Sequence, residues 1–119
     1  MVRAIRGATT VENNTKEEIW DATEEMLLEI INRNELNKED MISITFTMTK
    51  DLDACYPAVR AREMGFTNVP LINMQELFVK GSLEKCIRVI IETNSKKSLD
   101  EINHIYLRGA KKLRPDLAK

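Results

Sequence analysis

Residues 86–93 read CIRVIIET, and the pattern of this stretch indicates which other parts of the protein must pack against it. Its side chains follow the period of two of a β-strand, and one face carries Ile87, Val89 and Ile91. The other face is also largely apolar and carries Cys86, Arg88 and Ile90. The pattern therefore predicts a strand whose two faces are both covered by other parts of the protein.

Arg88 interrupts the second of these faces in the middle of the strand. A guanidinium held among apolar side chains needs an anionic partner or a good set of acceptors. Two interpretations stay open, a structural salt bridge and an arginine that binds an anion in a cleft. Arg6 poses the same question in a first strand expected at residues 2–8, where the plainer interpretation is a surface charge on an edge strand.

Two further segments carry clear periodicity. Residues 41–49 predict a half-buried strand, because serine and threonine alternate with the apolar residues Ile42, Ile44, Phe46 and Met48. A capping box of Thr15 and Glu18 predicts the start of a long helix that ends near residues 32–34. Its core-facing stripe is expected to consist of Ile19, Ala22, Met26, Leu27, Ile30 and Ile31.

The remaining elements are short. Pro70 restricts its strand to a sheet edge, or else marks the start of that strand. The resulting order, β-α-β-α-β-β-α-β, predicts one mixed α/β domain over residues 1–119. The short elements are a helix from Pro57 to Gly65, a strand at residues 68–73, a helix that begins at a Ser98–Glu101 capping box, and a strand at residues 104–108.

Composition excludes several classes of function. Eighteen basic and 19 acidic residues give a net charge of −1, which argues against a nucleic-acid partner. We find neither an apolar run long enough to cross a membrane nor an apolar secretory segment in the first ten residues, so no membrane partner is expected. Two well-separated cysteines, Cys55 and Cys86, favour the reducing cytoplasm, and a single histidine, His104, argues against a metal site.

Other polar residues have a plain and a functional interpretation. The plain interpretations are a solvated helix face for Arg60 and Arg62, a frayed tail for Arg114, an exposed turn for Glu76, ordinary packing for Tyr106, and a structural role for His104. Together with Arg6 and Arg88 they supply several arginines, one carboxylate and one tyrosine, without a nucleophile–base pair. Since arginine binds carboxylates through two parallel hydrogen bonds, this set indicates a site for a small dianion.

At this point the sequence resembles a known family, the small monofunctional bacterial chorismate mutases of the trimeric pseudo-α/β-barrel class, distinct from the all-helical class. The resemblance extends over nearly the whole chain, in six segments of the right order and spacing. These are IRGATTVE (5–12), DLDACYPAVRARE (51–63), VPLINMQE (69–76), KCIRVIIE (85–92), HIYL (104–107) and LRPDL (113–117).

The resemblance implies the conversion of chorismate to prephenate by an intramolecular Claisen rearrangement, in the biosynthesis of phenylalanine and tyrosine, without metal or organic cofactor. It implies that Arg88 lies beside the ether oxygen of the breaking bond and that Arg6 and Tyr106 bind one substrate carboxylate. Glu76 would accept a hydrogen bond from the ring hydroxyl, and Leu113 and Arg114 would close the mouth of the site. The neighbouring wall would be formed by Leu71, Ile72, Asn73, Met74 and Gln75.

The resemblance also implies a homotrimer with its active sites between subunits, in which three sheets bury the second face of each central strand. Tyr56, Ala58 and Arg62 would then come from a neighbouring subunit and meet the second carboxylate. Relatives carry a lysine where this chain has Val59. Arg60, the next residue, is the candidate substitute among the substrate-binding residues, although its side chain would leave the helix at a different angle.

Two alternatives stay open. A small trimeric imine or enamine deaminase resembles this architecture and also uses an arginine for a carboxylate, although the six segments fit it poorly. A non-catalytic trimeric sensor of a small anionic metabolite would keep Arg6 and Arg62 but would not need Arg88 beside an ether oxygen.

Overall fold

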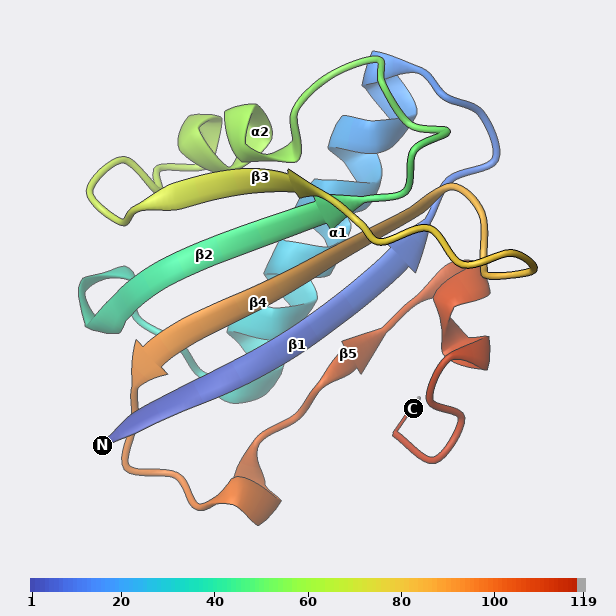
Figure 1. The fold of residues 1–119 in the computed structure, drawn as a ribbon. Coiled ribbons are helices and arrows are strands. Elements are labelled where there is room, and N and C mark those ends of the chain that lie inside the picture. The colour runs from blue at the N-terminus through green and yellow to red at the C-terminus, as the bar shows by residue number, and fades with distance from the viewer. Residues whose placement is uncertain (118–119) are drawn as a thin grey trace.

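The computed structural model describes residues 1–117, and over that range the chain forms one mixed sheet with helices on one side (Figure 1). The strand order is β3-β2-β4-β1-β5. The central strand β4 pairs antiparallel with β1 and β2, whereas the edge strands β5 and β3 run parallel to their neighbours. The strands are β1 (Val2–Thr10), β2 (Met41–Met48), β3 (Leu71–Gln75), β4 (Cys86–Asn94) and β5 (Ile105–Tyr106).

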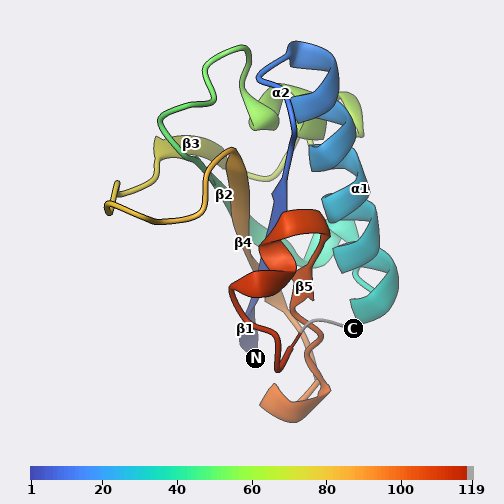
Figure 2. The same ribbon diagram turned by 90° about the vertical axis from the view of Figure 1, so that its right-hand side faces the viewer.

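Two α-helices, α1 (Lys16–Asn34) and α2 (Pro57–Glu63), pack on the same face of this sheet, as the edge-on view in Figure 2 shows. The described chain also contains three short 3-10 helices. Two lie in connections, η1 (Lys38–Asp40) and η2 (Leu99–Glu101), and η3 (Arg108–Lys112) follows the last strand. The core forms between the helices and the sheet. It contains the expected stripe of α1 and the Ile87, Val89 and Ile91 face of β4, all of which are buried except Ile31, which is partly exposed.

Helix α1 lies close to β1 because residue 7 is glycine. A Cβ atom at Gly7 would lie 2.7 Å from Cδ1 of Ile30 and 3.0 Å from Cγ1 of Val89. Real Cβ contacts are not that short, so a larger residue would push the helix and the strand apart. The close approach fixes the backbone next to Arg6.

The second face of β4 is open to solvent in this chain. Ile90 is 40% exposed and the Arg88 side chain is 43% exposed, although the sequence pattern predicts cover on both faces. The expectation of two covered faces is therefore wrong for one chain by itself. The helices cover the opposite face only, so any further cover has to come from outside the described chain.

Element boundaries differ from the sequence expectations where local geometry intervenes. A register shift between Met41 and Ser43 puts Met41, and not Ile42, on the buried face of β2, so Ile42 is 39% exposed. The strand expected at residues 68–73 begins only after Pro70 and lies at the sheet edge.

The C-terminal elements are shorter than expected. The Ser98–Glu101 capping box is present, but it caps a single 3-10 turn. The last strand contains only two residues, and Arg108, at a φ of 51°, already starts η3. Among the described residues, no helix is both long enough and apolar enough to span a bilayer.

Asn34 connects the end of α1 to the segment before β5. Its side-chain amide donates to the carbonyls of Ile30 (2.9 Å) and Asn103 (2.8 Å), and its Oδ1 accepts from the Asn103 N–H (2.7 Å). The side chain is 1% exposed, so water cannot replace these bonds.

Asn34→Ala is therefore expected to lower the free energy of unfolding by about 2–3 kcal/mol, because it leaves a buried N–H and carbonyl unpaired. Urea unfolding followed by circular dichroism measures this loss. Asn32→Ala, two residues earlier and exposed, is the matched control and should stay within about 0.5 kcal/mol of the parent. Equal effects of the two substitutions would contradict the role of Asn34.

Candidate active site

A pocket of about 390 Å³ lies on the open face of the sheet, within the size range of small-molecule sites. Four strands and the C-terminal segment contribute to its wall, so most of its residues stand on rigid elements. The lining consists of Arg6, Gly7, Ala8, Thr45, Thr47, Glu76, Arg88, Val89, Ile90, Tyr106, Leu113 and Arg114.

Arg88 occupies the central strand of this wall. Its backbone lies opposite Thr47 of β2 on one side and Ala8 of β1 on the other. Its Nε lies 2.7 Å from Oε1 of Glu76, but the N–H does not point at that oxygen, so the contact is an ion pair rather than an aligned hydrogen bond. The salt-bridge interpretation of Arg88 is thus confirmed, and the pair lines the pocket, so the anion-binding interpretation stays a prediction.

Glu76 is held from two directions. Its backbone N–H donates to the carbonyl of Met48 (2.8 Å), which extends the β2–β3 pairing by one residue. The Thr47 hydroxyl donates to Oε1 of Glu76 (3.0 Å), so one carboxylate oxygen faces both Thr47 and Arg88. Glu76 is therefore a fixed pocket carboxylate and not the exposed turn residue of the plainer interpretation.

Arg6 and Tyr106 enter the pocket from the other edge. Arg6 lies on β1, and its backbone N–H donates to Nδ1 of His104 (3.0 Å). Tyr106 is 6% exposed and packs with Ala8 and Ala110 in a small second core. The plain interpretation of Tyr106 as a packing residue is therefore confirmed, and the same residue also lines the pocket.

The C-terminal segment adds Leu113 and Arg114 to the wall. The Arg114 guanidinium pairs with both oxygens of Asp116, at 3.1 Å from Nε and 3.0 Å from Nη2. Hydrogen bonding from Arg114 lowers the pKa of Asp116 below its ordinary value. The geometry is the two-pronged one that arginine adopts with carboxylates.

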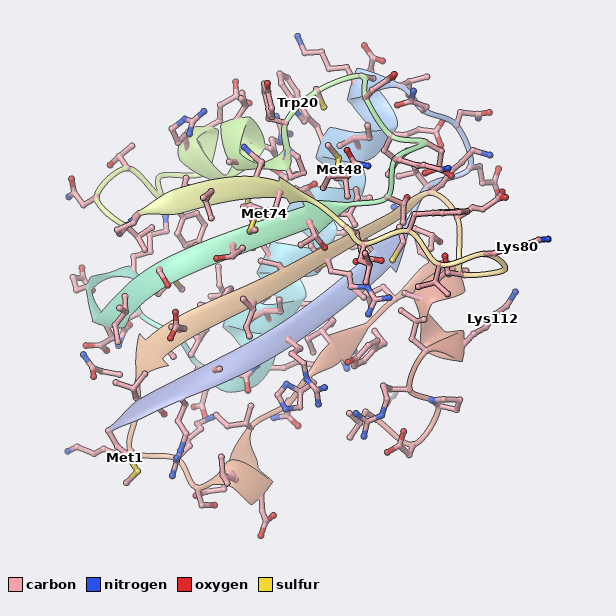
Figure 3. The ribbon with its side chains drawn as sticks, in the orientation of Figure 1. Met1, Trp20, Met48, Met74, Lys80 and Lys112 are labelled. Carbon is pink, nitrogen blue, oxygen red and sulfur yellow. The ribbon has the colours of Figure 1, made fainter. Side chains whose placement is uncertain are left out.

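A second group of expected site residues lies away from this pocket in the same chain. Tyr56 precedes α2 and is 63% exposed, while Ala58 is fully buried and donates its N–H to Oδ1 of Asn73 (3.2 Å). Tyr56, Asn73, Met74 and Gln75 instead line a smaller hollow beside β3, and Arg62, on α2, lines neither pocket. Figure 3 labels Met74 on this edge strand. Leu71 and Ile72 lie on the same strand, with Leu71 packed against the core and Ile72 54% exposed.

Arg60 has partners of its own. It contacts Glu24 of α1 at 3.2 Å and Glu63 at 3.4 Å, and its guanidinium carbon lies 5.8 Å from the Trp20 ring centre. These contacts fasten α2 to α1. They keep Arg60 at the helix layer, away from the pocket on the open face.

Sequence reasoning missed two contributors. Thr47, like Thr45, belongs to the polar face of β2, and the alternation that predicts the strand also indicates that this face lines something polar. His104 was expected to be merely structural, yet it contacts the backbone of Arg6. No sequence signal identifies that contact, because the partners are 98 residues apart.

The assembled pocket can bind an anion and present a carboxylate. It brings together three guanidinium groups, one carboxylate and one phenol, from Arg6, Arg88, Arg114, Glu76 and Tyr106. Within residues 1–117, no three His, Cys, Asp or Glu side chains gather into a group that could hold a metal ion.

Comparisons with known proteins agree with this arrangement. Residues 2–117 match the family model described as chorismate mutase type I. The chain is 45% identical to chorismate mutase AroH of Thermus thermophilus, over 98% of this chain and 97% of that protein. It is 44% identical to chorismate mutase AroH of Bacillus subtilis (strain 168), over 99% and 94%. A solved chorismate mutase from Clostridium thermocellum superposes with a TM-score of 0.90 at 53% identity, covering 92% of this chain and 97% of that one.

The two cysteine thiols differ in burial, and burial raises the pKa of both. Cys86 precedes Arg88 by two residues and is fully buried, and burial raises the pKa of its thiol to about 11 against the opposing charge of Arg88. Cys55 is half-buried, and burial raises the pKa of its thiol as well.

At pH 8 we expect one slowly reacting thiol in the native protein and two in guanidinium, measured with a chromogenic disulfide reagent. Cys55→Ser should remove the native reaction, and Cys86→Ser should leave it unchanged. Rapid native labelling of Cys86 would contradict the buried position of the residue beside Arg88.

Proposed function

Because this chain belongs to the type I chorismate mutase family, we propose that the pocket on the open face of its sheet is where it converts chorismate to prephenate. The observation that carries the assignment is the Arg88–Glu76 pair at 2.7 Å, on adjacent parts of one rigid wall. Neither the deaminase nor the sensor alternative receives support from the relatives found.

The reaction is an intramolecular rearrangement in which a C–O bond breaks while a C–C bond forms. No proton has to move and no covalent bond to the protein is needed, so catalysis depends on holding the folded substrate and meeting its charge. We assign Arg88 to the ether oxygen, where negative charge develops. Its central position in β4 supports this, because the strand is fixed by neighbours on both sides.

The other pocket groups suit the ends of a dianionic substrate. Arg6 and Tyr106 are assigned to one carboxylate, and Glu76 to the ring hydroxyl as an acceptor. Arg114 and Leu113 are assigned to the mouth of the pocket. There Arg114 would leave its ion pair with Asp116 and bind a substrate carboxylate instead. The short Arg114–Asp116 contacts support this exchange, since that pair already has carboxylate-binding geometry.

Magnitudes show what such a site has to supply. A millionfold acceleration corresponds to a barrier lowered by about 8 kcal/mol. One fixed charge at the developing oxyanion supplies about 3–4 kcal/mol of this. Holding the substrate in its reactive conformation accounts for the rest, because such positioning is worth up to about 7–11 kcal/mol.

We further propose that the active protein is a homotrimer, with Tyr56, Ala58 and Arg62 of one subunit completing the pocket of the next. Two observations support this. Those residues lie away from the pocket within one chain, and the open face and its edge carry exposed apolar side chains, namely Tyr56, Ile72, Met74 and Ile90. Leu71, Ile72, Asn73, Met74 and Gln75 would then lie along the seam between subunits.

Arg60 is a weaker candidate than Arg62 for the second carboxylate. It already contacts Glu24, Glu63 and the Trp20 ring, whereas Arg62 has no ion pair among the described residues. We therefore assign the second carboxylate to Arg62 rather than to Arg60. A cytoplasmic location is proposed as well, because Cys55 and Cys86 are both free thiols.

Arg88→Ala is expected to lower kcat/KM for chorismate by about 10²–10³-fold or more, because it removes the charge that meets the developing oxyanion. Arg88→Lys should lose nearly as much, since one ammonium does not reproduce the planar guanidinium. The measurement is the ultraviolet loss of chorismate, with the product checked as phenylpyruvate after acid treatment. Arg33→Ala, on the exposed side of α1, is the charge-matched control and should stay near wild type. Activity of Arg88→Ala within about threefold of wild type would rule out the assignment.

Subunit mixing tests the shared site. Arg88→Ala and Arg62→Ala, each impaired alone, should regain about a quarter of wild-type sites when unfolded and refolded together, because some seams then receive both intact arginines. Arg88→Ala mixed with Arg6→Ala should regain nothing, since those two residues serve the same subunit's pocket. Light scattering should give three times the 13.7 kDa chain mass. A monomer, or equal recovery in both mixtures, would contradict the trimer proposal.

A further inference from the structure

His104 extends the pairing between β1 and β5 at the point where that pairing is weakest. The backbone ladder of these strands contains only Gly7 opposite Ile105 and Ala8 opposite Tyr106. Before it, the Arg6 N–H donates not to a carbonyl but to Nδ1 of His104, at 3.0 Å. The imidazole therefore takes the place of a strand acceptor.

This contact fixes both pocket residues that come from this edge. The backbone of Arg6 is paired with Ile90 of β4 on one side, and the imidazole contact holds its other side. Tyr106 is held indirectly, because it lies only two residues after His104 in the chain, and the Leu107 N–H donates to the carbonyl of Ala8 (2.9 Å). Loss of the imidazole contact would thus loosen Arg6 and the start of β5 together.

The contact requires a particular protonation state. A nitrogen that accepts a hydrogen bond carries no proton, so the neutral ring has its proton on Nε2. Arg6 on β1 and Arg114 in the C-terminal segment place positive charge near the ring, and Asp116 balances Arg114 while Tyr106 follows on the same strand. Burial, with the charges of Arg6 and Arg114, lowers the pKa of His104 below its ordinary value of 6.5.

We propose that His104 is a positioning residue for the mutase reaction, which through its unprotonated Nδ1 fixes the side of Arg6 that faces β5 and loses this contact when the ring gains a proton, while the pairing of Arg6 with β4 remains. The proposal rests on the assignment of Arg6 to a substrate carboxylate. Because the rearrangement itself transfers no proton, a dependence on the charge of a histidine reports on binding geometry and not on acid–base catalysis.

The sign of the pH effect follows from the lowered pKa. The native protein binds fewer protons at His104 than the unfolded chain does between the lowered pKa and 6.5. Its contribution to stability is therefore full above pH 6.5 and falls as the pH drops below that value. Binding of substrate should weaken at lower pH still, as the pH falls toward the lowered pKa at which His104 of the native protein gains its proton.

Two substitutions separate the hydrogen bond from the packing of the ring. Asparagine carries an oxygen near the position of Nδ1 and does not titrate, whereas phenylalanine keeps the ring and has no acceptor. At pH 7.5, His104→Asn should keep KM for chorismate within about twofold, and His104→Phe should raise it about five- to tenfold with a smaller change in kcat. Between about pH 5 and 8, wild type should show a rise of KM toward acid that His104→Asn lacks.

Hydrogen exchange of the Arg6 backbone amide tests the same hydrogen bond to His104 independently of enzymatic activity. Its N–H should be protected in wild type and His104→Asn at pH 7.5 and should exchange faster in His104→Phe at the same pH; in wild type at acid pH its protection factor, which corrects for the slower intrinsic exchange there, should fall. A wild-type protein that does not convert chorismate would overturn the proposed function, while the exchange data would still test the contact.

Three results would overturn the positioning role. The first is a KM of His104→Phe equal to that of wild type. The second is the same acid rise of KM in wild type and His104→Asn, which would assign the titration to another group. The third is equal impairment of His104→Asn and His104→Phe, which would show that only the ring's packing matters.

Discussion

The arrangement of the sheet and the pocket depends on one ion pair, the contact of Arg88 on the central strand with Glu76 at the edge of the sheet. A guanidinium in the middle of β4 cannot face the helices, where its loss of hydration would go uncompensated. It therefore faces the open side, and the helices gather on the other. The two-layer arrangement and the position of the pocket are consequences of the same charge.

The pocket is rigid where its charges matter most. Arg88 and Thr47 lie opposite each other on neighbouring strands, and Glu76, the residue directly after β3, is held by the carbonyl of Met48 and the hydroxyl of Thr47, so the arrangement of this charged pair is fixed by the sheet. The periphery is different, because β5 contains only two residues and contacts Arg6 of β1 through the side chain of the preceding His104, and Arg114 pairs with a residue only two positions away. A fixed centre with an adjustable rim suits a reaction in which a flexible substrate has to enter before it is held.

Sequence reasoning reached the order of the strands and of the two α-helices, the buried stripe of α1 and the position of Arg88 within a strand, because each depends on local periodicity. It failed where tertiary contacts override local pattern. The register shift near Met41 exposes Ile42. The expected capping box is only half formed: the Thr15 hydroxyl accepts from the Glu18 N–H, but the carboxylate of Glu18 accepts from the N–H groups of Glu12 and Asn13 and not from that of Thr15. The His104 contact could not be predicted from the sequence, since it joins residues 98 positions apart. The separation of Tyr56 from the pocket of its own chain agrees with what the family resemblance implies.

The net charge of −1 conceals a marked separation of charge. Three arginines and one glutamate line the pocket, so its positive excess is balanced by acidic residues elsewhere on the surface. At physiological ionic strength such a field fades within about 8 Å. A dianion is therefore attracted only once it has nearly arrived, and capture relies on frequent random encounters with the open face rather than on long-range steering.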